Sequence, residues 1–359
     1  MTALYTNSRL KVLRECMRLH HYKYVLNIRT AATAVMDFGT IGHAALEAWL
    51  RAWKRNDLDA RLPDALAAIE VSHVSPHEKA RLAAIITAYH YRWHAQPWEI
   101  IEVEVEFRYE LAGYLIGGKI DGIIRDTRDG RVWLLEHKTT GEDASAGGTY
   151  WSRLALDSQI SIYVDGGTML GHEIAGCIYD VLQRPKHEPK LATPVDARKF
   201  TIGKGCKICG GNLQGKQGTA RVGDRDCAVC KGTGWRLDED GDPEAPRLHA
   251  NQRDTDETIE EFGDRITDAI ATEPDAFLIR GEVVRLDDEL PGMRQDLLDT
   301  IKIERAAALL EVAPRNPDAC AKYGRLCDFF GPCSGTESID DPVRFPRSEQ
   351  AHPELAATA

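Results

Sequence analysis

An apolar segment of the sequence ends in three consecutive residues that can ionise. In WLLEHKTTG (133–141) these residues are Glu136, His137 and Lys138. Glu136 and Lys138 are two positions apart, so in a β-strand their side chains lie on the same face. The carboxylate could bind a hard cation such as Mg²⁺ or Mn²⁺, and the lysine side chain could orient or deprotonate water and stabilise charge on a phosphate. A buried strand that simply reaches solvent would end in the same way.

A second carboxylate precedes this segment. Asp121 lies in YLIGGKIDGIIRD (114–126), and Asp129-Gly130, between the two segments, is a strong signal for a hairpin turn. The hairpin would place Asp121 beside Glu136, and two carboxylates on adjacent strands can share one divalent cation. A glutamate and a lysine two positions apart occur by chance in many proteins, so this pattern alone is weak.

Three further side chains could complete such a site. His43 lies in the largely apolar helical segment FGTIGHAALEAW (38–49), and Gln159 and Tyr163 are four residues apart in DSQISIYVDGG (157–167). Residues four apart share one face of a helix. Taken singly, a helical histidine is more often a core or surface residue, and a Gln–Tyr pair usually serves packing.

The nine cysteines indicate metal sites and not a disulfide framework, because the N-terminus lacks the apolar stretch of a signal peptide. Four of them form two CxxC pairs separated by seventeen residues: Cys206, Cys209, Cys227 and Cys230. Two such pairs bring four thiolates into a tetrahedron, and the metal then supplies folding energy that a short segment lacks. The spacing therefore predicts a Zn²⁺-binding ribbon, with redox chemistry as the rival.

Three other cysteines, Cys320, Cys327 and Cys333, follow a C-x6-C-x5-C pattern near the C-terminus. Three thiolates cannot complete a tetrahedral zinc site or an iron–sulfur cube, so a fourth ligand is expected. Cys16, about 300 residues earlier, is the candidate, and Cys177 in the apolar strand IAGCIYD is the competitor. A metal that joins such distant segments would offset the entropy cost of ordering the chain ends.

The periodicity of apolar residues predicts an α/β (α+β) core. Period-two or apolar strands are expected at 99–111, 114–126, 131–139 and 174–182. Helices are expected at 7–26, 38–53, 75–94, about 152–167, 257–272 and 292–312. Helices, a three-strand meander, a helix and a further strand are typical of this fold class.

Changes in composition suggest five segments. They are a core domain (1–200), the zinc-ribbon insertion (201–237), an acidic proline-containing linker (238–256), a helical region with three cysteines (257–335) and a polar tail that is expected to be flexible (336–359).

The bulk composition is that of a soluble protein. No apolar run approaches the roughly 20 residues that span a bilayer, so we expect a cytoplasmic protein without membrane contact. The net charge of −11 argues against non-specific coating of nucleic acid but not against a local basic groove. The N-terminal segment is basic, with Arg18 and Lys23 among tyrosines, and could contact single-stranded nucleic acid; a solvated helix face is the ordinary alternative.

The ordered set Gly-x-x-x-His, Asp, Glu-x-Lys and Gln-x-x-x-Tyr resembles the RecB-like branch of the PD-(D/E)XK nucleases. This branch includes bacterial recombination exonucleases, CRISPR-associated nucleases and many phage exonucleases. The resemblance covers residues 8–182 and implies a restriction-endonuclease-like core, which is a central mixed sheet flanked by helices. It implies that His43, Asp121 and Glu136 bind the catalytic metal, together with the carbonyl of His137.

The same resemblance assigns further roles. It implies that Lys138 is the catalytic lysine and that Gln159 and Tyr163 contact DNA or order the site. Glu106 in VEVEF matches an acidic position often found one strand before the aspartate, although Glu104 could serve equally.

The outer cysteines resemble those of the iron–sulfur subset of these nucleases. That resemblance implies a 4Fe-4S cluster held by Cys16, Cys320, Cys327 and Cys333, and zinc at the same thiolates is the rival. Residues 255–285 resemble the segment that precedes the C-terminal cysteines in phage members, which favours a phage or prophage protein.

The resemblance therefore implies a Mg²⁺- or Mn²⁺-dependent deoxyribonuclease. An exonuclease of recombination or repair is the favoured form, acting on single strands or duplex ends in a prokaryotic or phage-infected cytoplasm. A recombinase, helicase or annealing protein is the candidate partner. Two alternatives stay open: a non-catalytic nucleic-acid-binding or assembly protein that keeps the fold, and a zinc-ribbon adaptor for a protein partner.

Overall fold

The computed structural model describes residues 3–30, 34–145, 147–194, 197, 200–201, 247–322, 325–350, 352 and 355. The chain divides into two compact units. The first combines Met1–Lys186 with Gly263–Ala359, and the second is His187–Phe262. The cysteines of the predicted zinc ribbon lie outside the described residues: Cys206, Cys209, Cys227 and Cys230. The other candidate site residues all belong to the first unit.

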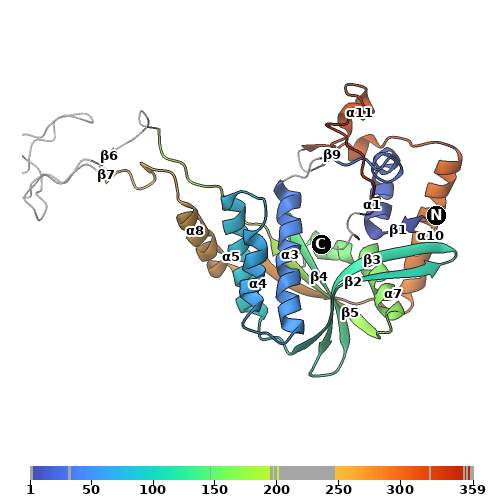
Figure 1. Cartoon of the computed structure of the whole chain (residues 1–359), viewed down its shortest axis with the longest axis horizontal. Coiled ribbons are helices and arrows are strands. Elements are labelled where there is room, and N and C mark those ends of the chain that lie inside the picture. The colour runs from blue at the N-terminus through green and yellow to red at the C-terminus, as the bar shows by residue number, and fades with distance from the viewer. Residues whose placement is uncertain are drawn as a thin grey trace, which may run out of the picture. The chain divides into compact units, whose positions relative to one another are not determined.

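A three-stranded antiparallel meander forms the centre of the first unit (Figure 1). It consists of β2 (Trp98–Leu111), β3 (Tyr114–Asp126) and β4 (Val132–Thr140). Gly113 and Gly130 in the two connecting turns have φ angles of +84° and +77°. Glycine adopts this left-handed conformation without steric cost, so the turns form where the sequence places glycine. The predicted hairpin between β3 and β4 is present.

Three further strands extend the sheet. β5 (Ile174–Gln183) pairs in parallel with β4, and β8 (Leu278–Val283) pairs antiparallel with β5. β1 (Leu4–Tyr5) pairs in parallel with β3, giving the order β1-β3-β4-β5-β8 with β2 also on β3. The predicted central mixed sheet is confirmed, while β1 and β8 were not expected from the sequence.

Helices cover both faces of this sheet (Figure 1). On one side are α3 (Ala34–Lys54), α4 (Arg61–Glu70) and α5 (Pro76–Trp93), and on the other are α1 (Asn7–Glu15), α7 (Ser158–Met169) and α10 (Glu289–Leu309). α3 contacts β2 and β4, and α7 contacts β2, β3 and β5. β3 is consequently buried along most of its length, which explains why apolar residues occur on both of its faces.

The expected helix over residues 7–26 is interrupted. α1 ends at Glu15, Cys16 has an extended backbone (φ −161°, ψ 119°), and α2 (Met17–His20) leads into a π-helical turn, η1 (His21–Val25). The expected helix over about 152–167 is likewise divided into α6 (Thr149–Leu154) and α7. Helical periodicity continues across both breaks, so it could not reveal them.

The remaining elements of the described residues are short or peripheral. They are β6 (Phe200–Thr201), β7 (Arg247–Leu248), α8 (Ile259–Thr272), α9 (Pro274–Phe277), η3 (Pro317–Ala319), β9 (Ala321–Lys322), β10 (Arg325–Leu326) and α11 (Phe330–Ser334). Across the described part of the chain, every helix is too short or too polar to cross a membrane.

Candidate active site

Strands β3 and β4 separate at the candidate site. Their ladder ends at the pair Gly122–Leu135, so Asp121 and Glu136 occupy the first position beyond it on each strand. β4 continues beside β5, whereas the far end of β3 pairs with β1. Asp121 Oδ2 accepts a hydrogen bond of 2.8 Å from the backbone amide of His137. The carboxylate thus satisfies an N–H group that the fork would otherwise leave unpaired in a buried place.

A histidine and a second acidic residue converge on Asp121. The ligand atoms of His43, Glu104 and Asp121 all lie within 4.8 Å of one another. His43 comes from α3, with Nδ1 3.5 Å from Asp121 Oδ2. Glu104 comes from β2, where its φ of +51° marks a local departure from regular strand geometry, and it forms an ion pair with Lys119. Imidazole and carboxylate groups in this arrangement could bind a divalent cation.

Glu104, and not Glu106, is therefore the acidic residue of β2 that reaches this group. Glu106 is exposed and lies 3.8 Å from Arg108 in an ion pair. The two glutamates alternate with apolar residues in the same way, so the pattern alone could not decide between them. The irregular backbone at Glu104 distinguishes them in the folded chain.

Glu136 is held from two sides but keeps one oxygen without a partner. Its Oε1 accepts a 2.6 Å hydrogen bond from Gln159 Nε2 and an ion-pair contact from Lys138. Its Oε2 is buried and, within the described residues, makes no hydrogen bond. Glu136 is not one of the residues whose ligand atoms group around Asp121. A buried carboxylate oxygen without a donor is costly, which suggests that this atom faces a ligand.

Burial dominates the electrostatics of these groups. It raises the pKa of Glu136 to about 8, with the Asp121 charge acting in the same direction. For Asp121 burial also acts upward, but His43 and the hydrogen bond from His137 outweigh it and lower the pKa below its usual range. Burial lowers the pKa of His43 to about 4, so its imidazole is neutral at pH 7 and able to act as a ligand.

The side chain of Lys138 lies on the same face of β4 as that of Glu136, as the spacing predicted. Although burial opposes its charge, the carboxylates of Glu136 and Asp121 raise the pKa of Lys138 above the ordinary value. Lys138 is therefore a cation at neutral pH. In this state it can stabilise negative charge but cannot accept a proton.

Tyr163 and Gln159 extend from α7 toward the same site. The Tyr163 ring packs edge-on against Phe107 at 5.6 Å. A Cβ atom at Gly118 would lie 2.8 Å from Phe107 and 3.0 Å from Tyr163, so glycine is needed for α7 to approach β3 this closely. Burial, and then the charge of Glu136, raise the pKa of Tyr163 well above its ordinary value. α7 is thereby seated so that Gln159 reaches the carboxylate.

A buried polar chain supports the other side of His137. The Tyr89 hydroxyl lies 3.1 Å from His137 Nε2 and donates to Asp180 Oδ2 at 2.7 Å. Arg280 donates two 2.6 Å hydrogen bonds to Asp180, and its guanidinium stacks over Trp93 at 3.8 Å. Because the tyrosine proton is given to Asp180, the hydroxyl oxygen can accept from the imidazole.

Sequence reasoning missed this chain of residues, as it missed the role of β8. One signal was present, a single aspartate inside the apolar strand IAGCIYDVL. A buried carboxylate requires partners, so Asp180 could have indicated a nearby cation, although not which one.

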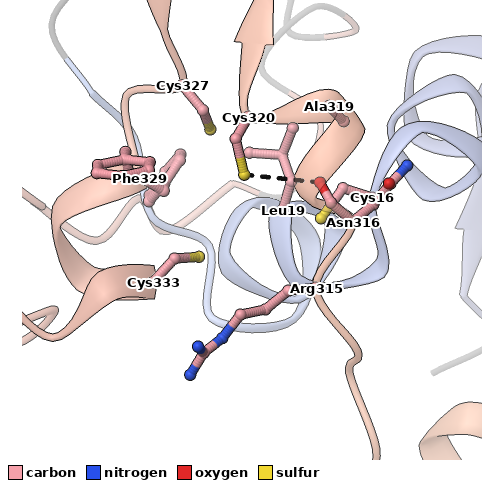
Figure 2. A pocket seen from close by; sticks show the side chains of 10 residues that line it. Cys16, Leu19, Arg315, Asn316, Ala319, Cys320, Cys327, Phe329 and Cys333 are labelled. Carbon is pink, nitrogen blue, oxygen red and sulfur yellow. Dashed lines mark hydrogen bonds between the residues drawn. The ribbon is translucent and has the colours of Figure 1, made fainter.

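The four outer cysteines lie together around one small pocket (Figure 2). Cys16, Cys320, Cys327 and Cys333 line it, with Asn316 and Phe329 among the other residues. No three of these four sulfur atoms all lie within 4.8 Å of one another. Cys320 Sγ is 3.6 Å from the carbonyl oxygen of Asn316. The competitor Cys177 is instead buried in β5, opposite Leu134 and Val283.

Direct contacts also join the two ends of the chain beside this pocket. Arg18, expected as a DNA contact, donates its backbone N–H to Pro314 and its Nε to the carbonyl oxygen of Ala313 at 2.7 Å. Tyr22 and Phe329 pack in a small apolar cluster with ring centroids 5.3 Å apart.

The second expected contact, Lys23, is half-buried beside Cys327. Arg18 and Lys23 are therefore both partly covered by other residues of the chain.

Comparison with known proteins identifies the family to which the chain belongs. A family model described as the PD-(D/E)XK nuclease superfamily matches residues 5–322. No protein of curated function matches the chain.

Solved structures that match include a protein from Eubacterium rectale described as a "Putative exonuclease". It has 12% identity and a TM-score of 0.32, and the match covers 50% of this chain and 68% of that one. The structure of SSO0001 has 18% identity and a TM-score of 0.20, with 40% and 60% covered.

Proposed function

Because the chain belongs to the PD-(D/E)XK nuclease superfamily, we propose that it is a Mg²⁺- or Mn²⁺-dependent deoxyribonuclease that hydrolyses phosphodiester bonds. The observation that carries this proposal is the fork between β3 and β4. Asp121 and Glu136 are the first residues beyond the paired part of the two strands, and Lys138 contacts the Glu136 carboxylate. A protein that only bound nucleic acid would have no use for two buried carboxylates and a lysine in this arrangement.

The residues present fit a divalent cation. Asp121, His43 and Glu104 offer ligand atoms within 4.8 Å of one another, and the unpaired Oε2 of Glu136 is a further donor. The carbonyl oxygen of His137 remains a candidate ligand. Oxygen ligands with one imidazole suit Mg²⁺ and, somewhat better, Mn²⁺. When bound, such an ion supplies Lewis-acid charge and lowers the pKa of coordinated water.

The remaining chemistry belongs to the protein's own side chains. Lys138, charged at neutral pH, stabilises negative charge on the phosphate as the bond to phosphorus changes. Gln159 orients Glu136 through the hydrogen bond to Oε1. Tyr163 and Gly118 hold α7 close to the sheet, so they are positioning residues for Gln159. Asp121 is oriented by the His137 amide.

We further propose that the enzyme is an exonuclease of recombination or repair in a phage or prokaryote, as the sequence resemblance implies. Single strands or duplex ends would be its substrates, and a recombinase, helicase or annealing protein would be its partner.

We propose that Cys16, Cys320, Cys327 and Cys333 hold a 4Fe-4S cluster. Their convergence on one pocket supports a shared ligand. The wide spacing of the sulfur atoms favours a cluster over one zinc ion, because Zn–S bonds of about 2.3 Å in a tetrahedron bring sulfurs within about 4 Å of one another. The proposal of Zn²⁺ at the inner four cysteines rests on their sequence spacing.

Cleavage assays test the activity. Purified protein would be incubated with end-labelled linear duplex, linear single-stranded DNA and circular single-stranded DNA, with Mg²⁺, Mn²⁺ or EDTA. We expect metal-dependent release of nucleotides from linear DNA and resistance of the circle. Cleavage of the circle would replace the exonuclease with an endonuclease. An absence of metal-dependent cleavage of every substrate would remove the proposed function.

A further inference from the structure

A pocket beside the candidate active site contains two cations that form no ion pair with any carboxylate of the described residues, although Glu142 and Asp157 also line it. The pocket encloses about 510 Å³, and Lys138 and Gln159 form part of its wall. α1 contributes Lys11 and Arg14, and the start of α7 contributes Ser158. Its size is that of pockets that hold small-molecule ligands or one unit of a polymer.

The other cations of this pocket already have partners. Lys138 forms its ion pair with Glu136, and Arg153 forms one with Glu142 at 2.5 Å. In the described part of the chain, by contrast, neither Lys11 nor Arg14 has a carboxylate oxygen within 4.0 Å. In a protein with a net charge of −11, two unpaired cations in one pocket are a local exception.

Arg14 is also held in a fixed orientation. Its Nη1 donates to Ser158 Oγ at 3.0 Å, and its Nε donates to Thr300 Oγ1 at 3.3 Å. Both partners are neutral hydroxyl groups, so the guanidinium keeps its whole positive charge. Burial lowers the pKa of Arg14, with the more distant charges of Asp296 and Asp157 opposing the shift. Arg14 is nevertheless exposed to solvent, and a guanidinium held in this orientation can bind an anion with several oxygen atoms.

We infer that this pocket binds the backbone of the nucleic-acid strand next to the bond that is cut, and that Lys11 and Arg14 bind one of its phosphates. This inference rests on the proposed nuclease function. Phosphate is favoured because the pocket adjoins the candidate cation site and combines lysine, arginine and hydroxyl groups, which supply most protein contacts to phosphate oxygens. Because the contacts are to the backbone, they would not depend on base sequence.

Binding without cleavage tests the inference. The probe is a fluorescein-labelled single-stranded oligothymidylate, whose anisotropy is measured with the full-length protein in EDTA over a range of NaCl concentrations. Lys11→Ala and Arg14→Ala should each weaken binding by about tenfold. Each should also reduce the slope of log affinity against log salt by about 0.7, the value for one phosphate contact on a single strand.

Arg131→Ala is the matched control, because it removes the same charge from the exposed turn at the other end of β4. It should leave affinity and slope unchanged. If Arg14→Ala disturbs folding through its contacts with Ser158 and Thr300, circular dichroism will reveal it, and Lys11→Ala decides. Binding by both variants that equals the Arg131→Ala control overturns the inference, as does wild-type protein that does not bind the probe.

Failure of the proposed function would look different. Wild-type protein that binds the probe through Lys11 and Arg14 but never cleaves with Mg²⁺ or Mn²⁺ would keep the phosphate pocket and remove the nuclease. Cleavage of DNA by the wild-type protein, together with unchanged binding by both variants, would keep the nuclease and remove the phosphate pocket.

Discussion

The backbone amide of His137 donates to Asp121 Oδ2 across 2.8 Å, at the point where β3 and β4 stop pairing. In an unbroken ladder this amide would bond to the neighbouring strand. The fork frees it, and the aspartate side chain takes the place of the missing strand. The separation of the two strands therefore creates the site and also orients its central carboxylate.

Replacing Lys138 by alanine should separate metal binding from cleavage. The ammonium group contacts Glu136 but is not itself a metal ligand, so Mn²⁺ should still bind. Loss of the charge that stabilises the phosphate should lower the rate of DNA cleavage by about 10²–10³-fold. Mn²⁺ binding by electron paramagnetic resonance and cleavage of end-labelled DNA measure the two effects.

The control for this variant is Lys54→Ala, which removes an exposed lysine paired with Glu102 on the protein surface. It should cleave like wild type. A Lys138→Ala protein with full activity would show that this lysine takes no part in the reaction.

Glu136→Gln should stabilise the metal-free protein while abolishing cleavage. The pKa of Glu136 is raised to about 8 in the folded state, against 4.5 for an ordinary glutamate. The folded state therefore favours the protonated form, and stability is lost as the pH rises from about 4.5 through about 8. Glutamine cannot ionise and avoids this loss, so its melting temperature in EDTA at pH 8 should exceed that of wild type by about 2 °C or more.

At pH 5 the two proteins should melt at nearly the same temperature. Glu110→Gln, at an exposed position of β2, should show no such difference at either pH. A destabilised Glu136→Gln protein at pH 8 would mean that the carboxylate is paired in a way that offsets its burial.

The same raised pKa makes metal affinity depend on pH. A cation that binds Glu136 must displace its proton below pH 8, so the affinity for Mn²⁺ should rise between about pH 6 and pH 8 and then level off. His43, with a pKa of about 4, stays neutral over this range and should not contribute to the change. Calorimetric titration in two buffers of different ionisation enthalpy would count about one proton released per ion at pH 6.5. An affinity that does not change over this range would exclude Glu136 as a ligand.

Much of this site could be predicted from the sequence because its signals are local. The period-two pattern and the glycine turns gave β2, β3 and β4 within one residue of their observed ends. Glu136 and Lys138 share a strand face by spacing alone, and Asp121 follows from the hairpin. The contact between Gln159 and Glu136 joins segments that the ordered motif set had already placed together.

What could not be predicted depends on distant packing or on backbone irregularity. The break at Cys16 turns a thiol away from a helix that the apolar pattern would have continued. Glu104 reaches the site through a left-handed backbone that no composition rule assigns to glutamate. Arg280 meets Asp180 only because β8 returns to the edge of the sheet about a hundred residues later, and Tyr89 reaches the same carboxylate from α5.

Tyr89→Phe should test whether the buried polar chain positions His137. The variant removes the hydroxyl that lies between His137 Nε2 and Asp180, leaving two buried groups with one partner fewer. Such a loss costs about 1–3 kcal/mol of folding free energy. If the buried polar chain also orients the His137 amide on Asp121, Mn²⁺ affinity and the rate of cleavage should each fall by about tenfold.

Tyr91→Phe, at an exposed position of the same helix, is the control. A Tyr89→Phe protein that loses stability but keeps wild-type metal affinity would make the chain purely structural.

Cys16→Ala should release the ends of the chain from each other without unfolding the sheet. Purified without air, wild-type protein should be brown with about four iron atoms at this centre, and the variant should lose both the colour and this iron. Closing a loop of about 300 residues contributes on the order of 6 kcal/mol, so the melting temperature should fall. The hydrogen bonds of Arg18 and the packing of Tyr22 on Phe329 would remain, and these retard but do not prevent opening. Limited proteolysis should therefore cut first between α10 and the C-terminal cysteines.

Cys177→Ala, which alters a thiol buried in β5, should keep the iron and the wild-type digestion pattern. Retention of iron by Cys16→Ala, or its loss from Cys177→Ala, would show that the fourth ligand had been wrongly chosen.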